Sequence, residues 1–325
     1  MKVLVAIKIH EAGIRILEEA GFNVVVNPKG RIVDEKWLCR ELRDAWAMLV
    51  TMRVHVTPEL LQCAEKLRLI VTVTSGYDHI DLEACEARGI CVANTPEPIS
   101  LAVAEHIVGL TLSLLRNIVR GDYYVRMGAW ESGPAPRALL STTLRGKTIG
   151  VVGMGRIGSA AASLFKALGT RRILYWSRRR KPEVEVILGA EFVDLDTLFR
   201  ESDVVVITVA YTPETFHLVG EGRLRLMRRG AVLVNTARGA VVDTEALVKA
   251  LKEGWIAGAA LDVYEQEPLP PNHPLTQLKN TILTPHIAGY TRESIEEAAR
   301  LAALQIVDFY RHRALRNPLT KACTG

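Results

Sequence analysis

The stretch "VVGMGRIG", residues 151–158, decides how the second half of this 325-residue chain folds. An apolar strand leads into Gly153, Gly155 and Gly158, and the small residues of "SAAASLFKALG" continue as a helical pattern. Glycines at these positions allow a tight turn, a close approach of the backbone to a pyrophosphate and close packing of helix on strand. The stretch therefore predicts the phosphate-binding turn of a dinucleotide site.

The chain that follows alternates short β-branched runs with helical patterns. After a Gly- and Pro-containing connection at 128–136, six apolar runs occur in order: "KTIGVVG", "RRILYW", "VVVITVA", "AVLVNTA", "AGAALDV" and "NTILTPH". Strands that alternate with helices favour a parallel sheet covered on both faces. Six such strands are what a dinucleotide-binding Rossmann fold requires.

The first hundred residues show the same alternation and predict a second parallel sheet. Its strands are expected in "KVLVAI", "NVVV", "AMLVT", "LRLIVTV" and "ICVAN". From Ser100 to Arg120 the sequence is apolar around most of a helical circumference, which predicts a largely buried helix, with Pro96 and Pro98 just before it. The last pattern, "RESIEEAARLAALQIVDFYRHRA", is amphipathic and is expected to return to the first domain.

We therefore predict an α/β protein with two doubly wound parallel-sheet domains. A Rossmann dinucleotide-binding domain, residues 99–289, is expected as an insertion in a discontinuous, flavodoxin-like substrate-binding domain formed by residues 1–98 and 290–325. The chain would cross the boundary twice. Two crossings predict a hinge, and a small ligand would be enclosed between such domains.

Composition and charge exclude several other classes of protein. Hydrophobic residues make up 49% of the chain and charged residues 24%, which suits a globular protein and argues against disorder. The net charge of +5 comes from scattered basic residues without interleaved aromatics, so we expect no nucleic-acid partner. Because no signal peptide or membrane span is evident, we expect a cytoplasmic protein with no membrane partner. The five cysteines lack metal-ligand spacing, so we expect reduced thiols and no metal.

The end of the second strand of the Rossmann series predicts which dinucleotide binds. NAD-dependent enzymes place Asp or Glu there to accept from the ribose 2′-hydroxyl, but this chain has Ser177, followed by Arg178, Arg179, Arg180 and Lys181. A hydroxyl and adjacent guanidinium groups can bind and neutralise a 2′-phosphate. We therefore expect NADP(H) as the preferred cofactor, with NAD(H) possible and Arg178 as the main contact; a solvated basic turn is the alternative.

Three further strings place ionisable residues at the ends of predicted strands. They are "NTARGAVVD" with Arg238, "LDVYEQEP" with Asp262 and Glu267, and "LTPHIAG" with His286. Reduction of a 2-oxo acid needs a cation for the carboxylate, an acid for the carbonyl oxygen and a carboxylate that stabilises that acid in its charged form. Arg238, His286 and Glu267 are the residues suited to these three tasks.

Together these strings resemble the D-isomer-specific 2-hydroxyacid dehydrogenases, and the resemblance covers nearly the whole chain, from "GYDHIDLEAC" through "AGAALDVYEQEPLP" to "TPHIAG". Within the family, "YWSRRRKPEVE" and "LVKALKEGWIAGAALDV" look most like the NADP-dependent glyoxylate/hydroxypyruvate reductases. The resemblance implies that Arg238 binds the substrate carboxylate, that His286 is the general acid/base with Glu267 as its partner, and that Asp262 holds the nicotinamide carboxamide. Ser75 and Gly76 match the loop whose backbone amides receive the carboxylate.

The resemblance also implies a full set of cofactor contacts. It implies a homodimer too, and the long apolar helix with the arm at 121–147 independently predicts the same homodimer. The expected cofactor contacts are Gly153, Gly155, Arg156, Ile157, Gly158, Ser177, Arg178, Arg179, Thr212, Pro213, Thr236, Ala237, Asp262, His286 and Gly289. The histidines without a matching catalytic context, His79, His106 and His217, are expected to be structural.

Two other functions stay open at this point. "PEPISLAVAEH" departs from many glyoxylate reductases and looks more like phosphoglycerate dehydrogenases, although we expect no C-terminal regulatory domain here. Phosphite dehydrogenases place a lysine where this chain has Ser75, and formate dehydrogenases have Gln where it has Pro285. A non-catalytic nucleotide-sensing protein of the same fold is the alternative from another class.

Overall fold

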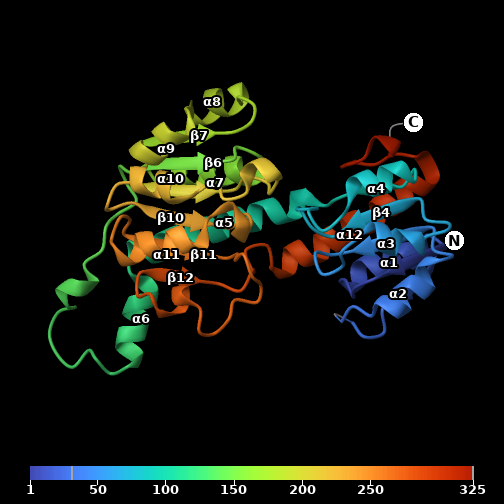
Figure 1. Cartoon of the computed structure of the whole chain (residues 1–325), viewed down its shortest axis with the longest axis horizontal. Helices are drawn as coiled ribbons and strands as arrows, with labels where there is room; N and C mark the ends of the chain where they lie inside the picture. The colour runs from blue at the N-terminus through green and yellow to red at the C-terminus, as the bar shows by residue number, and fades with distance from the viewer. Residues whose placement is uncertain (31, 324–325) are drawn as a thin grey trace. The chain divides into compact units, whose positions relative to one another are not determined.

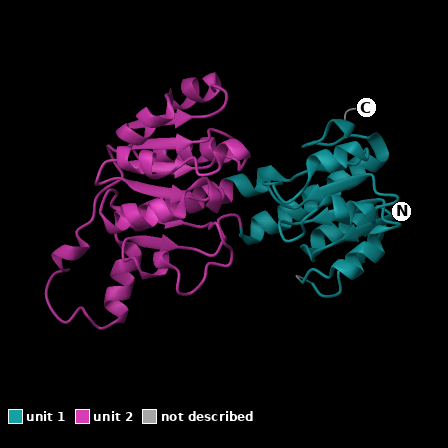
Figure 2. Ribbon diagram, in the orientation of Figure 1, with its two compact units in different colours: residues 1–100, 290–325 teal, residues 101–289 magenta. Residues whose placement is uncertain are grey.

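The computed structural model describes residues 1–30 and 32–323 and divides into two compact units (Figure 2). Unit 1 consists of Met1–Ser100 and the residues from Tyr290 on, and unit 2 consists of Leu101–Gly289. Each unit is a parallel sheet with helices on its faces (Figure 1). The predicted fold class, two parallel-sheet α/β domains, is confirmed.

Unit 1 is built on a five-stranded sheet with the order β2-β1-β3-β4-β5, the flavodoxin-like order. Its strands are β1 (Lys2–Val5), β2 (Asn23–Val26), β3 (Ala47–Val50), β4 (Leu69–Thr72) and β5 (Cys91–Ala93). Its helices are α1 (Glu11–Glu19), α2 (Glu35–Leu42), α3 (Pro58–Gln62), α4 (Leu82–Ala87) and α12 (Arg292–His312).

The strands of unit 1 are mostly apolar because both faces of the sheet are covered. Val3 and Val5 of β1 pack in the cluster that includes Ala299 and Ile306 of α12, whereas Leu4 between them packs on the opposite face with residues of α2 and α3. On the first of these faces, α1 and α12 approach closely at Gly13. A Cβ there would lie 2.6 Å from the Ala299 carbonyl oxygen, so this contact requires glycine.

Unit 2 is built on a seven-stranded sheet with the order β12-β11-β10-β9-β6-β7-β8. Its strands are β6 (Thr148–Val152), β7 (Arg172–Trp176), β8 (Glu191–Phe192), β9 (Val204–Ile207), β10 (Val232–Asn235), β11 (Gly258–Leu261) and β12 (Thr281–Leu283). Its later helices are α7 (Arg156–Ala167), α8 (Pro182–Leu188), α9 (Leu195–Glu201), α10 (Glu221–Leu226) and α11 (Thr244–Lys252). Short 3-10 helices occur at Arg137–Leu139, Pro213–Thr215, Gly239–Val241, Pro274–Gln277 and, in unit 1, Lys321–Cys323.

The six strands predicted for unit 2 are all present, and β8 is an additional edge strand. Sequence patterns missed β8 because it has only two residues, both exposed, and therefore shows no apolar run.

The long apolar helix differs from the prediction at both ends. It begins at Pro96, so Pro96 and Pro98 lie inside the first turn of α5 (Pro96–Leu115). Prolines fit there because first-turn amides have no partner within the helix. It stops at Leu115 because Asn117 adopts a left-handed conformation, with φ of 53°, and a separate helix α6 (Ile118–Arg126) follows. The Asn117 side chain donates to the carbonyls of Leu139 and Leu140.

By length and composition α5 could cross a membrane, since its mean hydropathy over 18 residues is 1.6. In the structure 39% of that window is buried, so the helix is less buried than predicted. Ile107, Leu110 and Leu115 are buried, and the His106 imidazole is hydrogen-bonded to Thr284.

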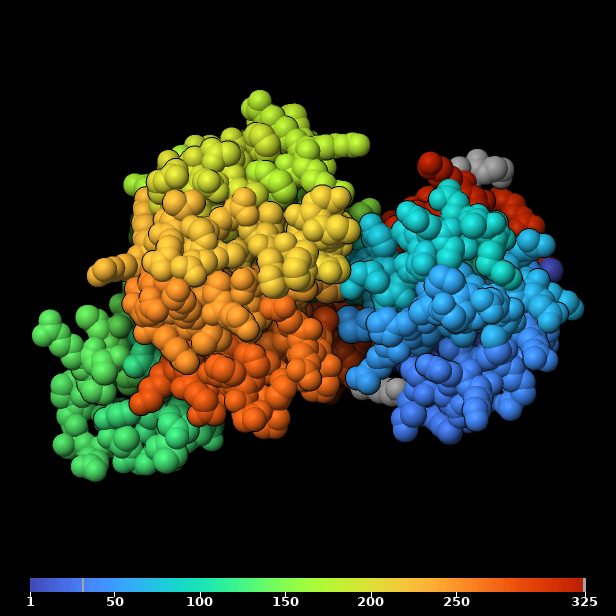
Figure 3. Space-filling view, viewed as in Figure 1, coloured from blue at the N-terminus to red at the C-terminus, as the bar shows by residue number. Residues whose placement is uncertain are grey.

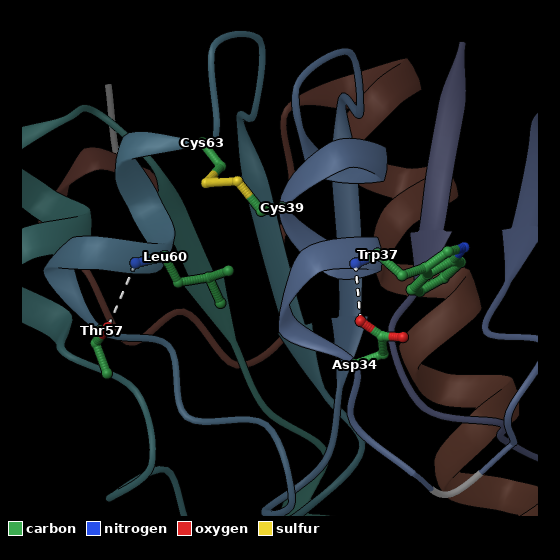
Figure 4. The surroundings of a disulfide bond; sticks show 6 residues. All are labelled: Asp34, Trp37, Cys39, Thr57, Leu60 and Cys63. Atoms are coloured by element: carbon green, nitrogen blue, oxygen red, sulfur yellow. Dashed lines mark hydrogen bonds between the residues drawn. A yellow bond between two sulfur atoms is a disulfide. The ribbon is translucent and has the colours of Figure 1, made fainter.

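The expectation of reduced thiols is wrong for two cysteines, because Cys39 and Cys63 form a disulfide (Figure 4). Their spacing of 24 residues matches no motif. The fold brings them together because α2 and α3 pack on the same face of the sheet, where Leu38, Leu42 and Leu61 share one cluster. Asp34 and Thr57 cap the two helices, accepting from the amides of Trp37 and Leu60. The Cα atoms of the two cysteines consequently lie 5.3 Å apart.

Candidate functional site

The predicted pyrophosphate turn joins β6 to α7 in unit 2. Gly153 has φ of 104°, and a Cβ there would lie 2.6 Å from the Val209 amide nitrogen. A Cβ on Gly158 would lie 2.2 Å from the Gly153 carbonyl oxygen, so helix and turn are in direct contact. A Cβ on Gly155, by contrast, would meet no atom within 4 Å. Gly155 therefore offers open backbone next to Arg156 and Ile157, which begin α7.

The basic turn after β7 is ordered by its own contacts. Arg180 forms two hydrogen bonds to the Glu185 carboxylate, of 2.8 and 2.7 Å, and the buried Tyr175 hydroxyl donates to the same carboxylate at 2.6 Å. The bond from Arg180, then that from Tyr175, lowers the pKa of Glu185 to about 2. The guanidinium of Arg180 is thus paired with Glu185. Arg178 and Arg179 are exposed. The Ser177 hydroxyl donates to the Arg179 carbonyl.

A second turn approaches Arg178 from the end of β9. Thr212 and Pro213 begin the short helix whose Glu214 carboxylate lies in the field of Arg178. The Thr212 amide donates to Thr215 Oγ1 at 2.7 Å, which fixes the turn. Two predicted cofactor segments follow strands β7 and β9, which flank β6, and they therefore lie at the same carboxyl edge of the sheet as the glycine turn.

The turn after β10 carries Thr236, Ala237 and Arg238. The Asn235 side chain fixes it, accepting from the Ala237 amide and donating to the Arg238 carbonyl, both at 3.0 Å. Thr236 is buried, and its Oγ1 makes no hydrogen bond within the part of the chain that the structure describes. A buried hydroxyl without a protein partner is expected to bond a ligand or water.

These observations fit a bound dinucleotide. The open backbone at Gly155, the exposed Arg178 and Arg179 and the unpaired Thr236 hydroxyl all belong to the carboxyl edge of one sheet, where ligands bind in open α/β folds. Among the described residues, no group of three His, Cys, Asp or Glu side chains could hold a metal ion.

His286 and Glu267 lie in contact at the same edge of the unit 2 sheet. The His286 Nδ1 atom is 2.7 Å from Glu267 Oε2, and Glu267 Oε1 accepts from the Tyr264 amide at 3.0 Å. Burial raises the pKa of Glu267, but the bonds from His286 and Tyr264, with the field of Arg238, lower it below its usual value overall. Glu267 is therefore a carboxylate near neutral pH, and the other two predicted catalytic side chains, His286 and Arg238, both help to lower its pKa.

Asp262 has a role that sequence reasoning missed. It is fully buried, and its carboxylate accepts from the amides of Ile287 and Ala288 at 2.9 and 2.8 Å and from the Thr284 hydroxyl at 2.5 Å. These bonds fix the segment that carries His286. The backbone of His286 is in the left-handed region, with φ of 54°. Gly289 follows directly.

Two of the histidines expected to be structural lie next to this site. His106 Nε2 is 3.7 Å from Asp262 Oδ1 and 3.3 Å from Thr284 Oγ1, and His217 Nε2 is 3.1 Å from Glu265 Oε2. His217 thereby holds the loop that carries Glu267. Sequence spacing gave no signal for either, because each partner lies tens of residues away in the chain.

The remaining predicted residues, Ser75 and Gly76, belong to unit 1, in the loop after β4. The Ser75 carbonyl accepts from the Asn94 side chain, and the Gly76 carbonyl accepts from the Thr74 hydroxyl.

Residues 108–288 match the model of the D-isomer specific 2-hydroxyacid dehydrogenase, NAD binding domain, which is more than half of the chain. The chain belongs to this family. A glyoxylate reductase of Thermofilum pendens is 48% identical over 307 residues, covering 94% of this chain and 90% of that protein. One of Thermococcus litoralis is 44% identical over 311 residues, covering 95% and 93%.

Solved structures of the family have the same fold. An NADPH-dependent glyoxylate/hydroxypyruvate reductase of Sinorhizobium meliloti, in complex with NADP and malonate, superposes with a TM-score of 0.88 at 30% identity, covering 99% of this chain and 97% of that one. This 2-hydroxyacid dehydrogenase is thus an oxidoreductase of the glyoxylate reductase type that acts on a 2-oxo acid and has an NAD(P)-binding domain.

Proposed function

We propose that the enzyme reduces a small 2-oxo acid, glyoxylate or hydroxypyruvate, to the D-2-hydroxy acid with NADPH, reversibly. The observation that carries the proposal is the His286–Glu267 contact of 2.7 Å with Arg238 close enough to lower the pKa of Glu267. The cofactor supplies the hydride that reaches the carbonyl carbon. His286 gives its proton to the carbonyl oxygen, Glu267 stabilises the charged imidazole, and Arg238 pairs with the substrate carboxylate.

The preference for NADPH is supported by the basic turn after β7. A 2′-phosphate carries charge that Arg178 and Arg179 can neutralise, and neither a carboxylate nor another anion occupies position 177. The structurally similar reductase of Sinorhizobium meliloti is NADPH-dependent, which points the same way.

The test is a substrate panel with wild type and His286→Ala. Glyoxylate, hydroxypyruvate, pyruvate and phosphohydroxypyruvate are each assayed with NADPH and NADH. We expect glyoxylate or hydroxypyruvate with NADPH to give the highest kcat/KM, and His286→Ala to lower turnover by roughly two to four decades while cofactor binding survives. A best rate with phosphohydroxypyruvate would favour the phosphoglycerate dehydrogenase alternative, and binding of NADPH without any turnover would favour a nucleotide sensor.

We also propose that the enzyme is a cytoplasmic homodimer that binds neither nucleic acid nor membrane. The dimer is supported by α6 and the arm after it, the green projection of unit 2 in Figure 3, where no residue of α6 is buried and Tyr123, Met127, Trp130 and Leu140 are all more than half exposed. Apolar surface of this extent usually marks an interface. Sedimentation of wild type and of a Val119→Glu/Tyr123→Glu variant tests it, since a 36 kDa wild-type monomer at micromolar concentration would refute the dimer.

A further inference from the structure

The C-terminal segment of residues 317–323 runs along β5, the edge strand of the unit 1 sheet. The Leu319 amide donates to the Val92 carbonyl at 2.8 Å, and the Val92 amide donates to Thr320 Oγ1 at 3.0 Å. An antiparallel bridge next to these bonds continues the pairing. The segment therefore covers a strand edge that would otherwise expose unpaired backbone groups.

This pairing brings together two cysteines that are far apart in the sequence. Cys91 begins β5 and is 2% exposed, whereas Cys323 is partly exposed in the 3-10 turn Lys321–Cys323. The two thiols are hydrogen-bonded to each other, and Cys323 packs against the apolar cluster that contains Cys91. Cys323 Sγ also lies 3.1 Å from Thr320 Oγ1 and 3.9 Å from the Val92 carbonyl oxygen. In the structure neither thiol is in a disulfide.

The two thiols differ in how readily they lose a proton. The hydrogen bond with Cys91, and after it the contact with Thr320, lowers the pKa of Cys323 to about 6, although burial acts in the opposite direction. The same hydrogen bond, together with burial, raises the pKa of Cys91. A thiolate is the form that attacks a disulfide, so Cys323 is the thiol that reacts first.

We propose that Cys91 and Cys323 are a redox site that closes to a second disulfide when the protein meets a small-molecule disulfide. The Cys323 thiolate attacks one sulfur of this oxidant, which forms a mixed disulfide and releases a first thiolate. Cys91 then loses its proton and attacks the Cys323 sulfur, which releases a second thiolate. The two cysteines are thereby oxidised by two electrons, and the oxidant is reduced to two thiols.

The new bond joins the two separate segments of unit 1. Cys91 belongs to the segment that precedes unit 2, and Cys323 belongs to the segment that follows it. The loop that the bond closes therefore contains all of unit 2, and closing a long loop removes much conformational freedom from the unfolded chain. We expect oxidation of this pair to raise the melting temperature.

The test incubates the reduced, folded, full-length protein with oxidised glutathione and then blocks the remaining thiols with N-ethylmaleimide. Trypsin places Cys91 in the peptide 89–116, Cys323 in 322–325 and Cys85 in 69–88. Without reductant, mass spectrometry should find the first two peptides linked, while Cys85 carries the maleimide. Maleimide on both Cys91 and Cys323, glutathione retained on Cys323, or a link between two chains would each overturn the proposal.

Cys323→Ser is the informative variant, because its side chain is partly exposed and the fold should tolerate the change. Melting temperatures are compared in a Cys39→Ser/Cys63→Ser background, which removes the first disulfide. Oxidation should raise the melting temperature by roughly 5–10 °C when Cys323 is present and leave it unchanged in Cys323→Ser.

Cys85→Ala in the same background is the matched control. It removes a buried thiol that packs on the opposite face of the sheet from Cys91, so both the linked peptide and the gain on oxidation should remain. Loss of the link in Cys85→Ala would show that Cys91 and Cys323 are not the partners. A linked peptide without any rise in melting temperature would overturn the stabilising effect.

Discussion

The backbone of Gly239 lies directly against the carbonyl of Tyr264, so closely that a Cβ on Gly239 would be 1.8 Å from the Tyr264 carbonyl carbon. Gly239 directly follows Arg238, and Tyr264 lies in the same loop as Glu267, after β11. The contact therefore sets the spacing between the residue proposed to bind the substrate and the partner of His286.

Gly239→Ala should force these two turns apart. We expect a loss of about 1–3 kcal/mol in the free energy of unfolding, as for overpacked core sites, together with a large fall in kcat/KM. Denaturant unfolding and steady-state kinetics measure both. Gly222→Ala is the control, because a Cβ at Gly222 in α10 meets open space and should leave stability equal or higher. Equal behaviour of the two variants would contradict the role of the contact.

Glu267→Gln should keep the shape of the pair and remove its charge. Without the carboxylate the charged imidazole is stabilised less, so kcat for reduction at neutral pH should fall about ten- to a hundredfold, a part of what general acid catalysis contributes. The pH above which kcat declines should move to lower pH. Glu265→Gln, on the same loop but paired with His217, serves as control and should leave the profile in place.

In wild type, the contribution of Glu267 to activity is lost at low pH, when its carboxylate becomes protonated. The pKa of Glu267 is lowered in the folded protein, so the contribution of its charge is fully present above the ordinary value near 4.5 and is lost as pH falls through the folded value. Activity should therefore show no loss from this group between pH 5 and 7, roughly the range above its titration. A titration of kcat within that range that Glu267→Gln abolishes would contradict the lowered pKa.

Asp262→Asn should misplace His286 although it never touches the reacting carbonyl. Asparagine offers one acceptor oxygen where Asp262 accepts from two amides and a hydroxyl, so at least one of these donors faces an NH2 group. We expect kcat to fall about tenfold or more. Asp243→Asn, at the N-cap of α11, should have little effect because asparagine caps helices as well as aspartate does.

Arg178→Ala should weaken NADPH by about 1.5–3 kcal/mol, with less effect on NADH. Arg180→Ala should change the ratio less, because Arg180 is bonded to Glu185. The double variant Ser177→Asp/Arg178→Ala should prefer NADH, because the new carboxylate at position 177 accepts a hydrogen bond from the 2′-hydroxyl of NADH and repels the 2′-phosphate of NADPH. The ratio of kcat/KM for NADPH to kcat/KM for NADH, measured in wild type and in each variant, tests these expectations. Equal loss of both in Arg178→Ala would mean that the basic turn is only solvated.

Cys39→Ser/Cys63→Ser should lower the free energy of unfolding by about 3.5 kcal/mol, the value expected for a closed loop of this length. Both residues lie on the outer helices of unit 1, so kcat/KM at moderate temperature should not change. A reducing agent should bring wild type to the stability of the variant. Identical stability of oxidised wild type and variant would show that the disulfide contributes nothing.

The sequence predicted those elements of the fold that depend on a local pattern of apolar residues. Apolar runs located the five strands of unit 1 and six of the seven in unit 2, because parallel strands buried on both faces hold few polar residues. Arg238, Glu267 and His286 could be assigned to one edge of the unit 2 sheet because each follows a predicted strand, whereas their catalytic roles stay predictions.

Features set by tertiary packing left no such pattern. The Cys39–Cys63 pair depends on two helices meeting on one face, and the end of α5 depends on carbonyls more than twenty residues further along that Asn117 reaches. Asp262 stays a predicted cofactor contact, but no sequence pattern showed that its carboxylate also binds the backbone behind His286. Which donors bond to the Asp262 carboxylate is visible only in the folded structure.

The return of α12 to unit 1 orders the events of synthesis. Ala299, Ala302 and Ile306 of α12 fill one face of the unit 1 sheet, yet the ribosome makes them after all of unit 2. During translation unit 2 can therefore complete its fold while unit 1, although begun first, still has that face of its sheet uncovered. Chains stalled on the ribosome after residue 289 should accordingly be cut by protease within residues 1–100 before they are cut within 148–283, and full-length chains should lose that difference.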